Sequence, residues 1–412
     1  MRIAFSMVVL FPLATQAAEP PLVIRNAAIE TMAGPGRIER GTIVIRDGKI
    51  VAVGKDVAVP EEATVIDAAG GTVMPGIIDP YFEVAVAAPT ADAGGRTVIV
   101  RGRPVTLPGA IGQPRATAFT RIADNFYPFD SGYKPLPRVG LTRLNLVTNG
   151  TGQAAVVRVT PGEPGQMLDR PDGVAFASIT NSSDSLDQVR QRLEAANRAK
   201  SSSSSRTAAP APGSQLWLDV LDGKSPLVTS AANSAAVLHL LKLLEPYKNV
   251  RATIFMGGDA VAETIDSLRG QNVTVVLRPG LDLVPNTRDR FNPARMLHMA
   301  GVDFVFSMTA RPPGAAVGQN AAAITGDAET PLTVEADTPL FPEAVLVKTG
   351  LPRTVALEAL TKRPAAMLGL GGTHGTIETG KTADLLLFSG DPLDPASRLL
   401  RTMIEGRTTY AN

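Results

Sequence analysis

Short runs of apolar, β-branched residues occur near both ends of the chain, and polar turns separate them. Thr42-Ile43-Val44-Ile45 and Ile50-Val51-Ala52-Val53 flank the turn Arg46-Asp47-Gly48-Lys49. Asp-Gly between two such runs is a strong β-hairpin signal. Near the other end, residues 383–388 have the pattern of a buried strand, and residues 401–407 that of a last strand and turn. We therefore expect both ends of the chain to share one small β domain.

Between these ends, short apolar runs alternate with amphipathic stretches. Helical periodicity occurs at residues 234–244, 260–268 and 293–300, and the glycine at position 301 is typical of a helix end. Strands that alternate with helices are typical of βα units in a parallel sheet. The candidate strands are residues 76–79, 144–147, 174–177, 227–229, 252–255, 274–277 and 304–306.

A low-complexity stretch interrupts this central region. Residues 186–200 predict a polar helix, which leads into a run of serines and then into alanine and proline. Such a composition is typical of a flexible loop. We therefore expect a flexible Ser/Pro-rich insertion at residues 200–214 rather than a domain boundary.

Composition narrows the possible chemistry. The 412 residues, 44% of them apolar, suffice for an α/β barrel of about 250 residues and a smaller domain. A net charge of +1 and 5% aromatics argue against nucleic-acid binding. Cysteine is absent, which excludes disulfides, thiolate nucleophiles and zinc–thiolate sites. Histidine, the commonest ligand of catalytic transition metals, occurs only as His239, His298 and His374.

The first residues predict export. Residues 1–18 combine a basic start, a short apolar stretch and small residues, as a secretory signal peptide does, and we expect cleavage after Ala17 or Ala18. No later segment has about 18 uninterrupted apolar residues, so we expect no membrane span. The prediction is a secreted or periplasmic protein.

The most informative motif is Val73-Met74-Pro75-Gly76-Ile77-Ile78-Asp79. It occurs together with residues 45–50, the helical pattern at 354–361 and residues 380–393. Taken in this order, these segments resemble the amidohydrolase superfamily, and most of all its imidazolonepropionase-like and related secreted members. The resemblance implies a distorted (β/α)8 TIM barrel at residues 73–372. It also implies a small β-sandwich composed of residues 19–72 and 373–412.

The resemblance also implies a metal-dependent hydrolase. Members of the superfamily hold one or two divalent metals, such as zinc, at the C-terminal mouth of the barrel. The metal activates a water molecule that attacks carbon–nitrogen bonds other than peptide bonds. In this chain the residues aligned with the family's ligands differ at every position. They are Tyr81 and Glu83 in place of the His-X-His pair, Ala175 for the lysine, Ser230 and Met256 for two histidines, and Thr309 for the last-strand aspartate.

The remaining histidines do not replace these ligands. The pattern places His239 within a helix, His298 in the last turn of another, and His374 in a turn of the β domain. Glu83 alone is too little for calcium, which takes six to eight oxygens. We therefore expect no cofactor and a degenerate member of the family that has lost metal-dependent hydrolysis.

Three functional hypotheses remain open. The first is a non-catalytic protein that binds a small molecule in the barrel mouth, or forms a homodimer or a heterodimer with an active homologue. The second is a hydrolase of carbon–nitrogen bonds with an unusual site around Tyr81 and Glu83. The third is an assembly module whose partner docks on the loop at residues 201–212.

Overall fold

The computed structural model describes residues 20–84, 97–100, 103–106, 119–179, 183–201, 213–284, 287–310 and 338–412. The predicted signal peptide and most of the predicted Ser/Pro-rich insertion lie outside these residues. Within the described part of the chain, no helix is both long and apolar enough to cross a bilayer.

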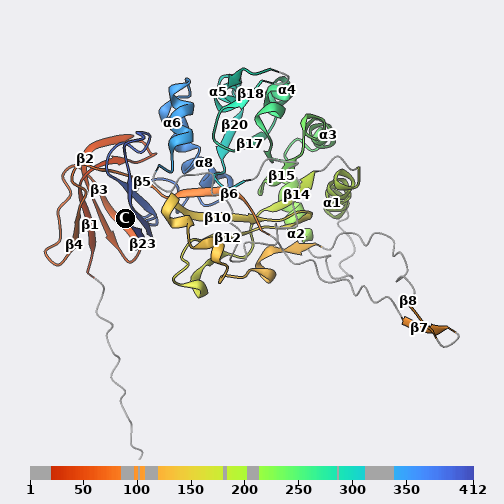
Figure 1. The fold of residues 1–412 in the computed structure, drawn as a ribbon, viewed down its shortest axis with the longest axis horizontal. Coiled ribbons are helices and arrows are strands. Elements are labelled where there is room, and N and C mark those ends of the chain that lie inside the picture. The colour runs from red at the N-terminus through yellow and green to blue at the C-terminus, as the bar shows by residue number, and fades with distance from the viewer. Residues whose placement is uncertain are drawn as a thin grey trace, which may run out of the picture.

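Strands from both ends of the chain form one eight-stranded sheet, which we call the terminal sheet (Figure 1). Its strands are β1 (Leu22–Glu30), β2 (Arg37–Arg46), β3 (Lys49–Gly54), β4 (Thr64–Asp67), β5 (Thr72–Pro75), β21 (Leu385–Phe388), β22 (Leu399–Ile404) and β23 (Arg407–Ala411). The order is β23-β22-β21-β5-β1-β2-β3, and β4 pairs with β1. The junction between the two chain ends is the antiparallel pair β5–β21.

The terminal sheet has the hairpin that the sequence predicts. Strands β2 and β3 pair antiparallel up to Arg46 and Lys49. The two residues between them, Asp47 and Gly48, have φ values of 51° and 72°. Positive φ at both central positions is what a tight type I′ hairpin requires, and Asp-Gly supplies it at low steric cost. The hairpin prediction is confirmed.

The terminal sheet also has its own hydrophobic cluster, which includes Ile24, Ile43, Leu385 and Met403, all buried. The rest of the apolar core forms a second, larger cluster around the central strands. The larger cluster also includes Met74 and Leu386 of the terminal sheet, and the division into two domains stays a prediction.

The central region consists of two further sheets. One has the order β20-β17-β16-β15-β14-β11-β9 and the other β13-β12-β10-β6. Parallel pairing runs from β14 through β15, β16 and β17 to β20, and β6 is parallel to β10. The bounds are β6 (Ile77–Glu83), β9 (Thr120–Arg121), β10 (Leu141–Val147), β11 (Thr151–Gln153), β12 (Ala155–Arg158), β13 (Leu168–Arg170), β14 (Ala175–Ile179), β15 (Leu227–Ala231), β16 (Ala252–Phe255), β17 (Val273–Leu277) and β20 (Asp303–Phe306).

All seven strands predicted in this region are present, and the result is a mixed α/β fold with parallel sheets. Two short antiparallel pairs complete the strands: β7 (Thr97–Val100) with β8 (Arg103–Thr106), and β18 (Asp282–Leu283) with β19 (Arg290–Phe291).

Helices follow most of the parallel strands, as βα units require (Figure 1). They are α1 (Ser183–Ser201), α2 (Ser214–Leu221), α3 (Ser234–Leu244), α4 (Gly258–Leu268), α5 (Pro293–Ala300), α6 (Phe341–Lys348), α7 (Arg353–Glu358) and α8 (Lys362–Met367). Helix α5 shows why the sequence marks its ends well. The Asn292 side chain accepts a hydrogen bond from the backbone N–H of Arg295, and Gly301 ends the helix at φ 69°.

The first and last central strands lie next to each other. The backbone N–H of Ile78 in β6 donates to Leu360 O (3.0 Å), and that of Phe306 in β20 donates to Ala359 O (2.9 Å). The segment before α8 therefore connects the start of β6 with the last residue of β20. The residues that follow β20 therefore lie close to the side chains of β6.

Candidate functional site

Asp79 is the best-connected side chain where β6 meets the end of β20. It is fully buried. Its Oδ1 accepts hydrogen bonds from Tyr81 N (2.9 Å) and Ser307 Oγ (2.7 Å). Its Oδ2 accepts from Thr309 N (3.1 Å) and Thr309 Oγ1 (2.8 Å). Burial raises the pKa of Asp79, and the hydrogen bonds from Ser307, Tyr81 and Thr309 oppose that rise.

These bonds give Thr309 a structural role. A carboxylate offers about four lone-pair positions, and Asp79 has a protein donor at each of them. Thr309, aligned with the family's last-strand aspartate, therefore acts as a donor that fastens β20 to β6. Asp79 itself has no acceptor position left for a metal ion.

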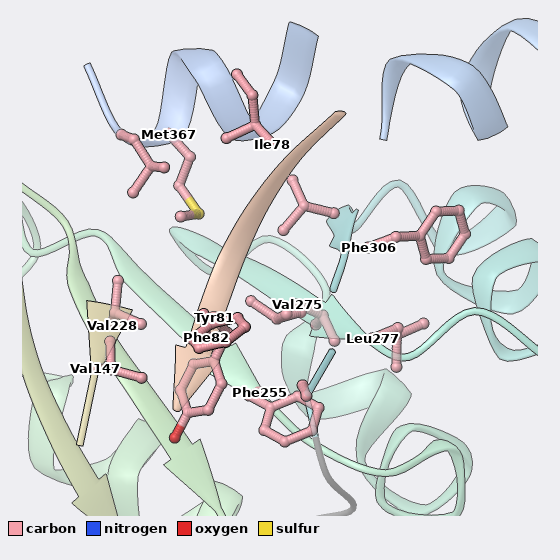
Figure 2. Packing of buried hydrophobic residues seen from close by; sticks show 14 of the residues in the cluster. Ile78, Tyr81, Phe82, Val147, Val228, Phe255, Val275, Leu277, Phe306 and Met367 are labelled. Atoms are coloured by element: carbon pink, nitrogen blue, oxygen red, sulfur yellow. The ribbon is translucent and has the colours of Figure 1, made fainter. Parts of the chain in front are cut away.

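Tyr81 is the next residue along β6 whose side chain points to the same face of the strand. It is buried, and its ring packs on Phe255 of β16 with 4.9 Å between ring centroids (Figure 2). Its hydroxyl forms a hydrogen bond with Ser230 of β15. Burial raises the pKa of Tyr81 to about 12, and the nearby charge of Glu83 adds to the rise. The phenol is therefore protonated at neutral pH.

The remaining predicted positions divide into two groups. Met256 is buried directly after β16, one residue beyond Phe255, which pairs with Ser230. Ser230 and Met256 thus lie at or directly after the ends of β15 and β16, Thr309 follows β20, and Tyr81 lies within β6. Their assignment as replacements for the family's ligands stays a prediction. Glu83 is the half-buried last residue of β6 and lies close enough to Tyr81 to influence its pKa.

Ala175 does not belong to this group, which corrects its predicted position. It is the first residue of β14 and pairs with Leu227, the first residue of β15. Since β14 and β15 run parallel, the residue level with Ser230 is Ser178. The sequence analysis places Ala175 within an expected strand at residues 174–177, whereas it is the first residue of β14.

The donor set at the strand ends does not fit the metal that the fold family implies. It consists of a protonated phenol, a thioether, two hydroxyls and one carboxylate at Glu83. Catalytic metals of this class need about three or more imidazole or carboxylate ligands at fixed geometry. Among the residues that the structure describes, no cluster of three histidine, aspartate or glutamate side chains could hold a metal ion.

A cavity of about 450 Å³ opens beside these positions. Phe255 and Met256 form part of its wall, so it adjoins the ring of Tyr81. The residues after β17, the hairpin β18–β19 and the first turn of α6 form the rest. This volume is within the usual range for small-molecule sites, about 300–1,000 Å³.

The histidines lie apart from this site. His239 is exposed on α3, and His298 is in the last turn of α5, as predicted. His374 is buried, and its Nε2 lies 3.0 Å from an Nη of Arg143 on β10. Burial lowers the pKa of His374, which favours its neutral form.

Sequence reasoning missed the charged cluster around Arg143, which connects the central strands to the terminal sheet. Arg143 is 1% exposed and lies 3.2 Å from Asp169 and 3.5 Å from both Asp384 and Glu405. Arg158 of β12 contacts the same Asp169 and Glu405, at 3.1 and 2.8 Å. An arginine inside an otherwise apolar strand pattern, Leu141-Thr142-Arg143-Leu144, was the available signal.

Glu343 is a second feature that the sequence did not reveal. It lies in the first turn of α6 and is fully buried, and among the described residues neither carboxylate oxygen has a hydrogen-bond partner. Burial raises its pKa to about 8. The residues of α6 that line the cavity, Phe341, Pro342 and Val345, lie on a different face of the helix.

Comparisons with known proteins agree with the fold. No protein-family model matches the chain. It is 45% identical over 67 residues to a 5'-deoxyadenosine deaminase of Methanosarcina mazei, a match that covers 16% of this chain and 15% of that protein. It is 38% identical over 82 residues to an imidazolonepropionase of a Geobacillus species, covering 15% and 19%. The chain thus matches less than a fifth of the length of these curated relatives.

The similarity in structure extends over almost the whole chain. An amidohydrolase from Thermotoga maritima superposes with a TM-score of 0.70 at 17% identity, covering 95% of this chain and 100% of that one. At this identity the likeness shows a common fold. The local sequence matches and the shared fold support a relationship of this chain to the amidohydrolase superfamily.

Proposed function

We propose that this protein is a non-catalytic member of the superfamily that has lost metal-dependent hydrolysis and binds a small molecule at the mouth of the fold. The observation that carries the proposal is how Asp79, Tyr81 and Thr309 are hydrogen-bonded and packed. The carboxylate is saturated by protein donors, and the phenol is packed on Phe255. Both are arranged as core residues.

The cavity beside these residues supports a role in small-molecule binding rather than a purely structural role. A purely structural barrel would fill such a space with side chains, because protein interiors are close-packed. Here the wall combines apolar side chains with two arginines, Arg278 and Arg290. Polar groups that converge in an apolar cavity are typical of ligand sites.

The proposal includes the finer architecture that the resemblance implies. It consists of a closed, distorted (β/α)8 barrel from residues 73–372 and a composite β-sandwich from residues 19–72 and 373–412. The contact between β6 and β20 and the two hydrophobic clusters support it. We also propose export through residues 1–18 and assembly as a homodimer, or as a heterodimer with an active relative. Light scattering on the purified protein tests the assembly.

The alternative is a surviving hydrolase of carbon–nitrogen bonds that uses Tyr81 and Glu83. The names of the relatives, a deaminase and an imidazolonepropionase, favour it. The pKa of Tyr81 opposes it, because a general base works best when its pKa is near the working pH. A phenol with a pKa of about 12 is a poor base at neutral pH.

Hydrolysis assays separate the two functions. Cyclic amides, cyclic ureas and amino-purine nucleosides would be incubated with the protein in zinc-containing buffer. The proposed function predicts no turnover above that of buffer, with the native protein and with Glu83→Gln alike. Turnover that disappears in Glu83→Gln but persists in the surface control Glu61→Gln would establish the alternative.

A further inference from the structure

The cavity between the ends of β16, β17 and β20 has a distinct chemical character. Its apolar part comes from Phe255, Leu277, Met308 and the first turn of α6. At its rim Phe341 is 51% exposed. A large aromatic side chain left half in water at the entrance of a cavity favours an apolar occupant.

Two basic residues and one acidic residue line the described part of the cavity. Arg278 follows β17 and is half-buried, and Arg290 begins β19. The one acidic residue of the lining is Asp282. Its Oδ2 accepts a hydrogen bond from Gly258 N (2.9 Å), and its Oδ1 accepts one from Leu283 N (2.8 Å). This carboxylate is therefore held by backbone donors at the start of α4.

Gly258 has no side chain and so leaves room for the Asp282 carboxylate beside the start of α4. A Cβ atom at position 258 would lie 2.4 Å from Asp282 Oδ2, so a side chain there would displace the carboxylate. The Asp282 carboxylate thus occupies the position at the start of α4 where a helix N-terminus favours a negative charge. Arg278 and Arg290 are the other charged residues of the described lining, and their guanidinium groups favour an anion over a metal cation.

We propose that this cavity binds a small amphipathic anion, with an aryl or alkyl body against Phe255 and Leu277 and a carboxylate directed to Arg278 and Arg290. The inference rests on the proposed function, because it names the ligand class of the same mouth. Arginine suits this role, since its guanidinium matches a carboxylate with two parallel hydrogen bonds. The cavity volume, about 450 Å³, accommodates such a molecule.

Three probes of equal size test the ligand class by isothermal titration calorimetry: 4-phenylbutyrate, its neutral amide and the cationic 4-phenylbutylamine. We expect the carboxylate to bind at least roughly tenfold more tightly than the amide, as a charge-assisted hydrogen bond would provide. The amine should bind more weakly still. Equal affinities for carboxylate and amide, or no binding of the carboxylate, would overturn the inference.

Three variants localise the effect. Arg278→Gln should remove the preference for the carboxylate over the amide. Arg288→Gln is the matched control, because Arg288 is exposed in the β18–β19 hairpin next to Arg290 and does not line the cavity. Val345→Trp should fill the cavity and weaken both probes, with circular dichroism and urea unfolding checking that the fold is retained. A preference that survives in Arg278→Gln, or that disappears in Arg288→Gln, would contradict the site.

The two proposals can fail separately. If the probes bind alike but hydrolysis assays are negative, the anion specificity is wrong and the non-catalytic function stands. If turnover is found while 4-phenylbutyrate binds through Arg278, the site is right and the loss of catalysis is wrong.

Discussion

At the scale of single residues, one buried carboxylate holds β6 and the end of β20 together. Asp79 belongs to the motif by which the sequence resembles its superfamily, and the structure uses it as an acceptor for Ser307, Thr309 and the backbone of Tyr81. Its partners come from positions 228 and 230 residues later in the chain. The first and last central strands are thus joined by a buried, satisfied polar contact.

Replacement of this acceptor should destabilise the protein. In Asp79→Asn, the amide NH₂ group would replace one of the two carboxylate oxygens. It would then face either the donors of Thr309 or those of Ser307 and Tyr81. One buried donor then loses its acceptor, so we expect the free energy of unfolding to fall by about 1–3 kcal/mol. Urea denaturation measures it, with the exposed Asp303→Asn on β20 as control. Equal stability of the two variants would show that the hydrogen bonds of Asp79 contribute little.

Glu343 should make stability depend on pH. Its pKa is raised from 4.5 to about 8, so folding favours the protonated acid. That stabilisation is complete below the unfolded pKa and is lost as pH rises through about 8. On this account, the free energy of unfolding falls by on the order of 3 kcal/mol between about pH 5 and pH 8.

The variant Glu343→Gln tests the assignment. It keeps the size of the side chain and cannot ionise, so its free energy of unfolding should change less over the same pH range. The exposed Glu61→Gln should keep the pH dependence of the native protein. If the native protein and Glu343→Gln follow the same curve in urea denaturation, Glu343 is not the titrating group.

Residue positions could be predicted where they follow a strand directly. Ser230, Met256 and Thr309 reach the expected ends because each comes at or just after a recognisable apolar run. Ala175 did not, because an apolar run does not reveal which of its residues is level with a neighbouring strand. The role of Asp79 was also hidden, since its partners are distant in sequence.

At the scale of elements, the Arg143 cluster is what joins the terminal sheet to the central strands. It is located near the start of β10, at the end of the strand opposite to the mouth. In (β/α)8 barrels, the architecture that we propose for this chain, that end serves stability and the other end serves chemistry. The cluster contains two arginines and three carboxylates, and His374 adds a neutral ring beside Arg143.

Removal of the buried arginine should be costly. Arg143→Met leaves Asp384 without its buried cation and Asp169 with Arg158 alone, and breaking such a pair costs about 3–5 kcal/mol. Arg25→Met is the matched control, because the Arg25–Asp67 pair is 54% and 47% exposed and should contribute about 0–1 kcal/mol. Thermal and urea unfolding would measure both. Similar losses in the two variants would argue against a special role for the cluster.

Elements were the most predictable level of this fold. The Asp47-Gly48 hairpin, the end of α5 at Gly301 and the seven predicted central strands follow from local signals that act within a few residues. The pairing of β5 with β21 links segments more than 300 residues apart. The strand patterns at both ends predict a shared β domain but do not reveal which strands pair.

At the scale of the whole molecule, we propose a fold that is retained while its metal ligands are replaced. The described residues form parallel sheets and share their fold with an amidohydrolase, and they include no cluster of side chains that could hold a metal ion. Apolar patterning predicts such a core well, because burial depends on residue class more than on identity. A cavity and its charges depend on side-chain packing, which explains why the site around Arg278 could not be predicted.

The most direct test of the central claim is the metal content of the protein by inductively coupled plasma mass spectrometry. The protein would be purified without chelators, dialysed against excess zinc, and then desalted. We predict that zinc, manganese and iron each remain far below one ion per chain, because the strand ends lack a sufficient set of ligands. Retention of one or two ions per chain, lost in a Glu83→Gln variant, would contradict the account.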